Sequence, residues 1–306
     1  MKNILITGGT GFIGSAISKA LCLKNYNITV LDNNSRGKID NIYEYKKIKF
    51  IKGDIRNYKN VVKACKKIDT VIHLAAVNGT KYFYEKPSTV LEVSAKGIIN
   101  IIDVCRKKKI KNLFLASSSE VYHYPNKIPT DENESIKIPD IMNPRFSYAG
   151  GKIFTELMGI HFGRKFFKRL IIFRPHNVYG KNMGNEHVIP EFISRMKKDR
   201  SNNFFIKGSG KETRSFIHID DFVKAFLLVF EKGKHMNIYN IGTQSMVSIN
   251  QLCKLIASIL KKKIIIKNRP IAKGGTKVRC PDITKIKKLG SIKFLTLKEG
   301  LKKVIF

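Results

Sequence analysis

The chain has 306 residues, 43% hydrophobic and 10% aromatic, which is typical of a folded protein with one large domain or two coupled ones. The apolar run that opens the chain stops at Gly8, too early for the core of a signal peptide, and no later run is long enough to span a membrane. We therefore expect a cytoplasmic protein with no membrane partner. The formal net charge of +35 comes from lysines spread along the whole chain, which favours solvated surfaces and anionic ligands over a nucleic-acid-binding stripe.

Five cysteines lie far apart, without a Cys-x-x-Cys pair or a neighbouring cluster of histidines: Cys22, Cys65, Cys105, Cys253 and Cys280. In the expected compartment this spacing indicates reduced, structural thiols. We expect no bound metal.

Short apolar runs alternate with helical patterns through the first half of the chain. Strands are expected at residues 3–7, 28–31, 48–51, 70–74, 112–116 and 170–174, and helices at 13–23, 61–65, 89–106 and 148–166. Strands that are apolar throughout and separated by helices are typical of a parallel sheet covered on both faces. The sequence therefore predicts an α/β fold built on a Rossmann-type doubly wound parallel sheet.

After Pro175 the loops lengthen and are interrupted by prolines and glycines. This change predicts a smaller C-terminal domain that binds the substrate. A helix at 220–230 and a strand at 237–241 indicate one return to the sheet. We expect residues 1–175, with 216–243 returning to them, to form the first domain and residues 176–306 the substrate-binding region.

The segment TGGTGFIG, residues 7–14, directly follows the first strand and opens the first helix. Gly8 permits a tight turn, Gly11 lets the backbone approach a pyrophosphate, and Gly14 lets the helix pack closely on the sheet. Free N–H groups and the helix dipole favour negative charge at this point. We interpret this turn, including Phe12 and Ile13, as a dinucleotide-binding site.

Asp32 lies at the end of the second expected strand. A carboxylate there accepts hydrogen bonds from both ribose hydroxyls and repels a 2′-phosphate, so NAD is preferred over NADP. Arg36 and Lys38 follow closely and weaken this exclusion.

Together with these segments, residues 53–56 (GDIR) and 73–76 (HLAA) resemble the extended short-chain dehydrogenases/reductases of the NAD-dependent epimerase/dehydratase family. The resemblance implies that Asn33 belongs to the cofactor site and that Asp54 and Ile55 hold the adenine. It also implies that Ala75 and Ala76 line the path to the nicotinamide. We interpret His73, inside the same motif, as a packing residue.

The resemblance also implies a catalytic Tyr-x-x-x-Lys pair, and four pairs have this spacing: Tyr43/Lys47, Tyr45/Lys49, Tyr82/Lys86 and Tyr148/Lys152. Pro87 ends any helix bearing the third pair, and the first two precede the third strand on the adenosine side. Only Tyr148 and Lys152 begin a long helix after the fifth strand, where the nicotinamide belongs. We expect the lysine charge, with that of oxidised nicotinamide, to lower the pKa of Tyr148 so that it accepts a proton from a sugar hydroxyl. Lys152 would also bind the nicotinamide ribose.

The segment Ser118-Ser119-Glu120 closes the fifth strand. The resemblance implies that Ser118 binds the reacting sugar oxygen. Ser119 replaces the aspartate that dehydratases of this family use as an acid, and the Ser-Glu pair is more similar to nucleotide-sugar decarboxylases. Glu120 stays a candidate acid–base residue or a structural carboxylate.

The segment RPHNVYG, residues 174–180, resembles the substrate motif of the family. The resemblance implies that Pro175 flanks the nicotinamide, that Asn177 reaches the sugar or diphosphate, and that Val188 lies beside the nucleotide base. It further implies that Arg214 and Arg279 bind the diphosphate, which two guanidiniums can clamp bidentately.

The leading interpretation is therefore an NAD-dependent nucleotide-sugar epimerase that oxidises the sugar, at C4, to a keto intermediate and returns the hydride. A decarboxylase or 4,6-dehydratase would use the same first step, and a dehydrogenase would release NADH. A non-catalytic RNA-binding relative is disfavoured because the glycine motif and the Tyr-Lys pair are both intact. A homodimer formed through the helices at 89–106 and 148–166 is implied by the resemblance.

Overall fold

Seven parallel strands form the central sheet of the computed structural model, which describes residues 2–198, 201–270 and 274–306. The strand order is β11-β6-β5-β4-β1-β2-β3, and every neighbouring pair is parallel. The bounds are β1 (Asn3–Thr7), β2 (Asn27–Asp32), β3 (Ile48–Lys52), β4 (Thr70–His73), β5 (Asn112–Ala116), β6 (Arg169–Pro175) and β11 (Asn237–Ile241). The predicted Rossmann-type sheet is confirmed.

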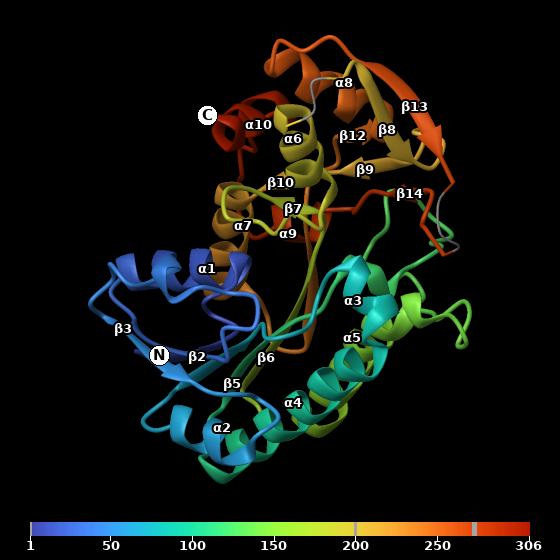
Figure 1. Cartoon of the computed structure of the whole chain (residues 1–306). Helices are drawn as coiled ribbons and strands as arrows, with labels where there is room; N and C mark the ends of the chain where they lie inside the picture. Colours follow the sequence, from blue (N-terminus) through green and yellow to red (C-terminus); the bar gives the residue numbers. More distant parts are fainter. Residues whose placement is uncertain (1, 199–200, 271–273) are drawn as a thin grey trace.

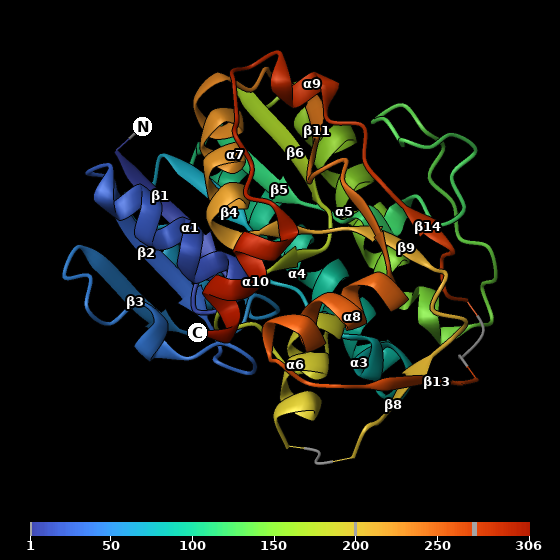
Figure 2. The ribbon, with the colours of Figure 1, turned by 90° about the horizontal axis from the view of Figure 1, so that it is seen from above.

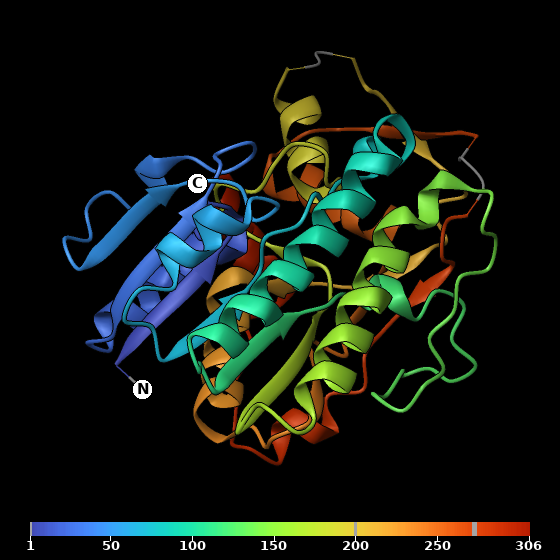
Figure 3. The same cartoon turned by 90° about the horizontal axis from the view of Figure 1, so that it is seen from below.

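Helices cover both faces of the sheet because its strands carry apolar side chains on both sides. On one face, Ile4 and Ile6 of β1 pack in one core with helices α1 (Phe12–Leu23) and α7 (Ile219–Lys232), which lie across the strands in Figure 2. On the other, Leu5 packs in a second core. This core includes residues of α2 (Tyr58–Ala64) and α4 (Pro87–Lys107), and α5 (Ser147–Gly163) lies beside α4 in Figure 3.

The helices and strands expected from the sequence begin and end within a few residues of their predicted bounds. Strands β1, β5 and β11 have the predicted bounds, while α5 ends at Gly163, before the expected Phe166. Helix α3 (Thr80–Glu85) was not predicted. It is six residues long and lies between Gly79, whose φ is +128°, and the Lys86-Pro87 boundary, so its sequence offers no helical repeat to detect.

Strand β11 pairs with β6 at the edge of the sheet, so the chain does return to it after leaving. The limits predicted for the two domains stay a prediction.

Most of the remaining elements lie above the carboxyl ends of the central strands in Figure 1, whereas α9 packs beside α7 and β11. Helices α6, α8 and α10 share a third apolar core with β8. The strands are β7 (Val178–Tyr179), β8 (Asn203–Lys207), β9 (Thr213–Ser215), β10 (Ile217–His218), β12 (Met246–Ser248), β13 (Ile265–Arg269) and β14 (Val278–Arg279). The helices are α6 (Val188–Lys198), α8 (Ile249–Ile259), α9 (Thr284–Lys287) and α10 (Leu297–Ile305), with 3-10 turns η1 (Ile39–Asn41), η2 (Ser119–Val121) and η3 (Pro144–Phe146).

All five cysteines are buried free thiols. Within the described part of the chain, no helix combines the length and apolar character that crossing a bilayer requires.

Candidate active site

A cavity of about 650 Å³ opens at the carboxyl ends of β1, β2 and β4. Eleven of the residues predicted to bind the cofactor line it: Gly8, Gly11, Phe12, Ile13, Gly14, Asp32, Asn33, Asp54, Ile55, Ala75 and Ala76. Lys152 and Pro175 are not among its lining residues. Pro175 is the last residue of β6, and Lys152 lies on α5.

The glycine turn has the geometry that a close-fitting anion needs. Gly8 has a φ of +72°, and a Cβ there would lie 2.9 Å from the backbone of Ala75. A Cβ on Gly14 would collide with the carbonyl oxygen of Gly8. Helix α1 begins at Phe12 with no side-chain cap and no acidic residue in its first turn, so its N-terminal amides are free of a competing carboxylate.

Asp32 connects this turn to the loop that follows β2. Its carboxylate accepts hydrogen bonds from the backbone amides of Thr10 at 3.0 Å and Asn34 at 2.9 Å. A carboxylate oxygen offers two lone pairs, so each oxygen can still accept a ribose hydroxyl.

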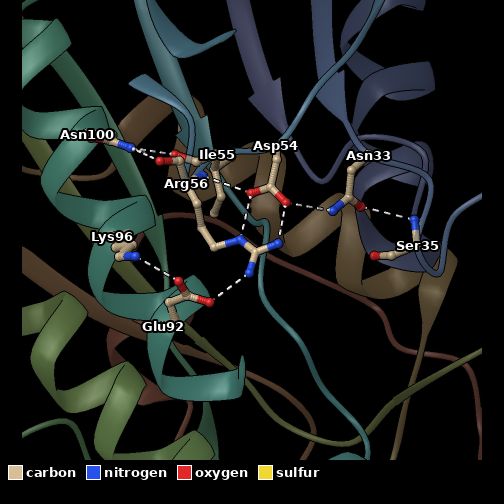
Figure 4. A network of polar contacts seen from close by, with 8 residues as sticks. All are labelled: Asn33, Ser35, Asp54, Ile55, Arg56, Glu92, Lys96 and Asn100. Carbon is tan, nitrogen blue, oxygen red and sulfur yellow. Dashed lines mark hydrogen bonds and ion pairs between the residues drawn. The ribbon is translucent and has the colours of Figure 1, made fainter. Parts of the chain in front are cut away.

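At the far end of the cavity, Asp54 is the centre of the polar network in Figure 4. Arg56 donates to both of its carboxylate oxygens, at 3.1 and 2.8 Å, and these hydrogen bonds hold the pKa of Asp54 below its usual value. Arg56 also reaches Glu92 of α4 at 2.7 Å, and Asn100 of α4 donates to the carbonyl of Ile55. The loop after β3, which is predicted to hold the adenine, is thus anchored to α4 by Arg56 and Asn100, two residues for which no role is predicted from the sequence.

Ser118, Tyr148 and Lys152 meet at the end of β5. The side chain of Ser118 lies close enough to the Tyr148 phenol to affect its pKa, and the tyrosine ring stacks on Phe83 with centroids 5.0 Å apart. The Lys152 ammonium lies 5.7 Å from the centre of the tyrosine ring and donates to the carbonyl of Ala116 at 2.8 Å. Ser118 is therefore brought into one polar cluster with two residues of α5, Tyr148 and Lys152.

The electrostatics of this cluster differ from the expectation. Burial raises the pKa of Tyr148, and the side chain of Ser118 only partly offsets this increase. Burial lowers the pKa of Lys152 to about 8, against the opposing charge of Glu156. The chain's own residues therefore keep the phenol protonated at neutral pH. The predicted lowering of the tyrosine pKa is not produced by Lys152 alone.

The tyrosines of the other three Tyr-x-x-x-Lys pairs lie outside the cluster of Ser118, Tyr148 and Lys152. Tyr43 is 79% exposed. Tyr45 contacts Lys19, and Tyr82 lines the cofactor cavity with the guanidinium of Arg36 over its ring.

Glu120 is held between two arginines. It accepts from Arg145 at 3.0 Å and from Arg279 at 2.8 Å. Burial would raise the pKa of Glu120, but the charges of Arg279 and Arg145 outweigh it and hold the pKa well below its usual value. An ionised carboxylate with two guanidinium partners has no proton to give at neutral pH, so this geometry favours the structural role over the acid–base role.

Beside Glu120 lies His123, which the sequence analysis did not select. It is buried with a φ of +42°, and neither ring nitrogen has a hydrogen-bond partner among the described residues. Its ring meets the edge of Phe146 at 4.4 Å, and burial lowers its pKa to about 4. No sequence signal marks this residue, because its setting depends on residues far along the chain.

Arg214 and Arg279 are directly opposite one another on the parallel strands β9 and β14. Arg279 donates to Glu120 and to Thr276, while Arg214 donates to the carbonyl of Thr276 at 2.7 Å. Burial, with the neighbouring Arg279 charge, lowers the pKa of Arg214 to about 10. The predicted pair of diphosphate-binding arginines is therefore adjacent in space.

The other predicted substrate residues lie around this pair. Asn177, at a φ of +39°, donates to the carbonyl of Ser215 at 3.0 Å. Val188 begins α6, and Ser119 is buried at the start of η2.

Arg36 connects two sides of the cofactor cavity. It pairs with Glu186 at 3.4 Å and lies 5.3 Å from the centre of the Tyr82 ring. Residues 182–187 and the loop after β2 both line the cavity, so this contact spans it. From the sequence, Arg36 is expected only to weaken discrimination against NADP, and its contact across the cavity is not predicted.

Beneath the site, Arg174 and Glu156 form a buried ion pair. Two hydrogen bonds of 2.8 and 2.6 Å join them, and each side chain is only 3% exposed. Arg174 also donates to Tyr122 at 2.7 Å. The pair ties α5, which carries Tyr148 and Lys152, to β6.

Comparisons with known proteins agree with this geometry. The profile of the NAD dependent epimerase/dehydratase family matches residues 4–242. A putative UDP-glucose 4-epimerase of Methanocaldococcus jannaschii is 35% identical, over 99% of this chain and 97% of that protein. The human dTDP-D-glucose 4,6-dehydratase is 33% identical, over 85% of this chain and 75% of that protein. The crystal structure of a UDP-glucose 4-epimerase from Thermotoga maritima with UDP-glucose superposes with a TM-score of 0.90 at 30% identity, covering 99% of this chain and 97% of that one.

Proposed function

Because the chain belongs to the NAD-dependent epimerase/dehydratase family, we propose that it is an NAD-dependent nucleotide-sugar 4-epimerase. It oxidises C4 of a sugar carried on a nucleoside diphosphate and returns the hydride to the other face. The observation that carries this proposal is the convergence of Ser118, Tyr148 and Lys152 at the end of β5.

In the first step the phenolate of Tyr148 accepts the proton of the C4 hydroxyl, while Ser118 holds the same oxygen. Bound NAD supplies the hydride acceptor and a positive charge close to the phenol. Burial raises the pKa of Tyr148. The charge of bound NAD and that of the Lys152 ammonium would both favour the phenolate. In the second step Tyr148 gives the proton back to the keto oxygen. The net reaction moves no electrons, so no NAD would be consumed.

The residues around the cavity suit NAD. The free amides at the start of α1 would bind the pyrophosphate, and Asp32 would accept the ribose hydroxyls and repel a 2′-phosphate. Arg36, the residue that could favour NADP, is engaged by Glu186 and Tyr82.

For the substrate, Arg214 and Arg279 would bind the diphosphate, with Glu120 orienting Arg279. The relatives named UDP-glucose 4-epimerases make UDP-glucose and UDP-galactose the first substrates to test.

Dehydration is the second candidate, because dTDP-D-glucose 4,6-dehydratases are also close relatives. It has less support, since Ser119 replaces the usual acid and Glu120 is held ionised by two arginines.

We also propose a homodimer formed through α4 and α5, which lie side by side on one face. Leu91 and Ile99 on α4 and Leu157 and Phe162 on α5 are large exposed apolar residues, which a second copy would cover. The cytoplasmic location expected from the sequence stays a prediction.

The decisive experiment is to incubate the purified protein with NAD and a panel of UDP-, dTDP-, GDP- and CDP-sugars and to analyse the products by mass spectrometry and chromatography. An isomer of unchanged mass supports the epimerase. Loss of water identifies a dehydratase and loss of carbon dioxide a decarboxylase, and either outcome would refute the proposal.

A further inference from the structure

Fifteen of the 46 lysines of this chain lie on one edge of the fold, although the lysines look evenly scattered in the sequence. In a parallel sheet, the turns that precede the strands all lie at the edge opposite the carboxyl ends. In Figure 3 the strand that starts at the labelled N-terminus runs away from this edge. We define the basic edge as these turns with the adjoining helix ends: residues 2–3, 23–27, 43–48, 63–70, 103–112, 161–169 and 230–237.

The basic edge contains eighteen lysines and arginines and four acidic residues. It therefore has a net charge of +14 in 48 residues, out of +35 in all 306 residues. This charge density is several times that of the rest of the chain. The concentration becomes visible only when the turns are brought together by the fold.

Most of this charge is available to a partner. All but two of the eighteen side chains, Lys111 and Arg169, are exposed. Among the described residues of this edge, one ion pair joins side chains, Lys24 with Glu231 at 2.9 Å. Asp69 is occupied by the backbone amides of Lys2 and Asn3.

Stabilisation of helix ends does not account for the number of charges. Helices α1, α2, α4, α5 and α7 end at this edge, and a cation near each C-terminus would be favourable. Five helix ends call for about one cation each, far fewer than eighteen.

In contrast to the expectation of no membrane partner, we propose that the basic edge docks on an anionic lipid bilayer. Fifteen of its eighteen cations are lysines, which act as point charges. Specific nucleic-acid contacts favour the planar, stacking guanidinium of arginine. The charges are spread over the width of seven strands, roughly 30 Å at the usual strand spacing, which a flat charged surface can meet all at once. Leu23 and Tyr43 project from the same turns, 72% and 79% exposed.

This mode of docking leaves the proposed active site accessible. The cofactor cavity and the Ser118, Tyr148 and Lys152 cluster lie at the carboxyl ends of the strands, on the opposite edge of the sheet. A protein bound to a bilayer by its basic edge would keep the carboxyl edge of the sheet in water, where nucleotide sugars can reach it.

The test is co-sedimentation of the full-length protein with vesicles of phosphatidylcholine alone and with vesicles containing phosphatidylglycerol, over a series of salt concentrations. The edge variant carries Lys66→Glu, Lys108→Glu and Lys165→Glu, one exposed lysine from each of three turns. The matched control carries Lys254→Glu, Lys261→Glu and Lys263→Glu, three exposed lysines near α8, so both variants lose the same net charge. Lysine-to-glutamine versions at the edge positions guard against misfolding caused by reversed charges.

We expect the protein to bind anionic vesicles at least tenfold better than neutral ones and to dissociate at high salt. The edge variant should lose at least tenfold in binding, and the control less than threefold. Equal losses in the two variants would overturn the proposal, because overall charge would then explain binding. Failure to bind anionic vesicles would also overturn it, and so would preferential binding of an RNA oligonucleotide that the edge variant abolishes.

Discussion

The two edges of the same sheet use charge in opposite ways. At the carboxyl edge nearly every charged group has a specific partner: Asp32 with two amides, Asp54 with Arg56, and Glu120 with two arginines. At the amino edge, the exposed lysines outnumber the acidic groups and rarely pair. Paired charges hold side chains in one geometry, as catalysis requires. Unpaired charges instead sum to an electrostatic potential that attracts anionic partners. Single substitutions should therefore matter greatly at the first edge and little at the second.

The largest expected effect is on Tyr148. Tyr148→Phe removes the proposed proton acceptor and should reduce turnover by roughly 10²- to 10⁴-fold, with little change in folding. Steady-state kinetics on the active nucleotide sugar measures this. The matched control is Tyr43→Phe, an exposed tyrosine of the same Tyr-x-x-x-Lys spacing. Full activity in the Tyr148 variant would refute the mechanism.

Breaking the buried ion pair should have the next largest effect. Arg174→Met leaves the carboxylate of Glu156 buried without its partner, so the free energy of unfolding should fall by about 3–5 kcal/mol. Denaturant unfolding measures the change. Lys81→Met removes one partner of an exposed pair with Glu85 and should change stability by less than about 0.5 kcal/mol. If both variants lost a similar free energy of unfolding, burial would not be what makes the Arg174–Glu156 pair stabilising.

The pH dependence of stability should reveal Lys152. Its pKa is lowered from 10.5 to about 8 in the folded chain, so between these two values the unfolded chain holds more protons. Stability relative to Lys152→Met should therefore rise from pH 8 to pH 10.5, by up to about 3 kcal/mol, and be flat below pH 8. Chemical denaturation of the cofactor-free protein at several pH values provides the measurement. A constant difference across this range would show that the lysine is not desolvated.

A smaller effect is expected at the contact across the cofactor cavity. Glu186→Gln weakens a partly exposed ion pair with Arg36, so NADH should dissociate roughly two- to fivefold faster. Stopped-flow fluorescence of NADH release measures the rate. Glu191→Gln, which weakens a comparable pair with Arg195 on α6, should leave the rate unchanged. Equal acceleration in both variants would argue against a specific role for Glu186.

The smallest effect should come from the amino edge. Lys66→Gln removes one exposed charge from the surface, so both stability and turnover should stay within experimental error of the wild type. A loss of activity comparable to that at the carboxyl edge would remove the distinction between the two edges.

The sequence alone predicted those features of the protein that are set by residues close together in the chain. The alternation of apolar strands and helices predicted the parallel sheet, and Gly8, Gly11 and Gly14 predicted the cofactor turn, because turn geometry and burial are written in short segments. The family resemblance implied a Tyr-x-x-x-Lys pair, and the start of a long helix after the fifth strand selected Tyr148 and Lys152 from four pairs of that spacing.

Only the tertiary structure decided which distant groups meet. Glu120 is paired with Arg279, 159 positions away, and this contact turns a candidate acid into an ionised anchor. Burial raises the pKa of Tyr148, so the lowering expected from Lys152 and oxidised nicotinamide together stays a prediction, and the fold brings fifteen scattered lysines to one edge. Desolvation and charge pairing depend on what surrounds a group in space, so no reading of adjacent residues could supply them.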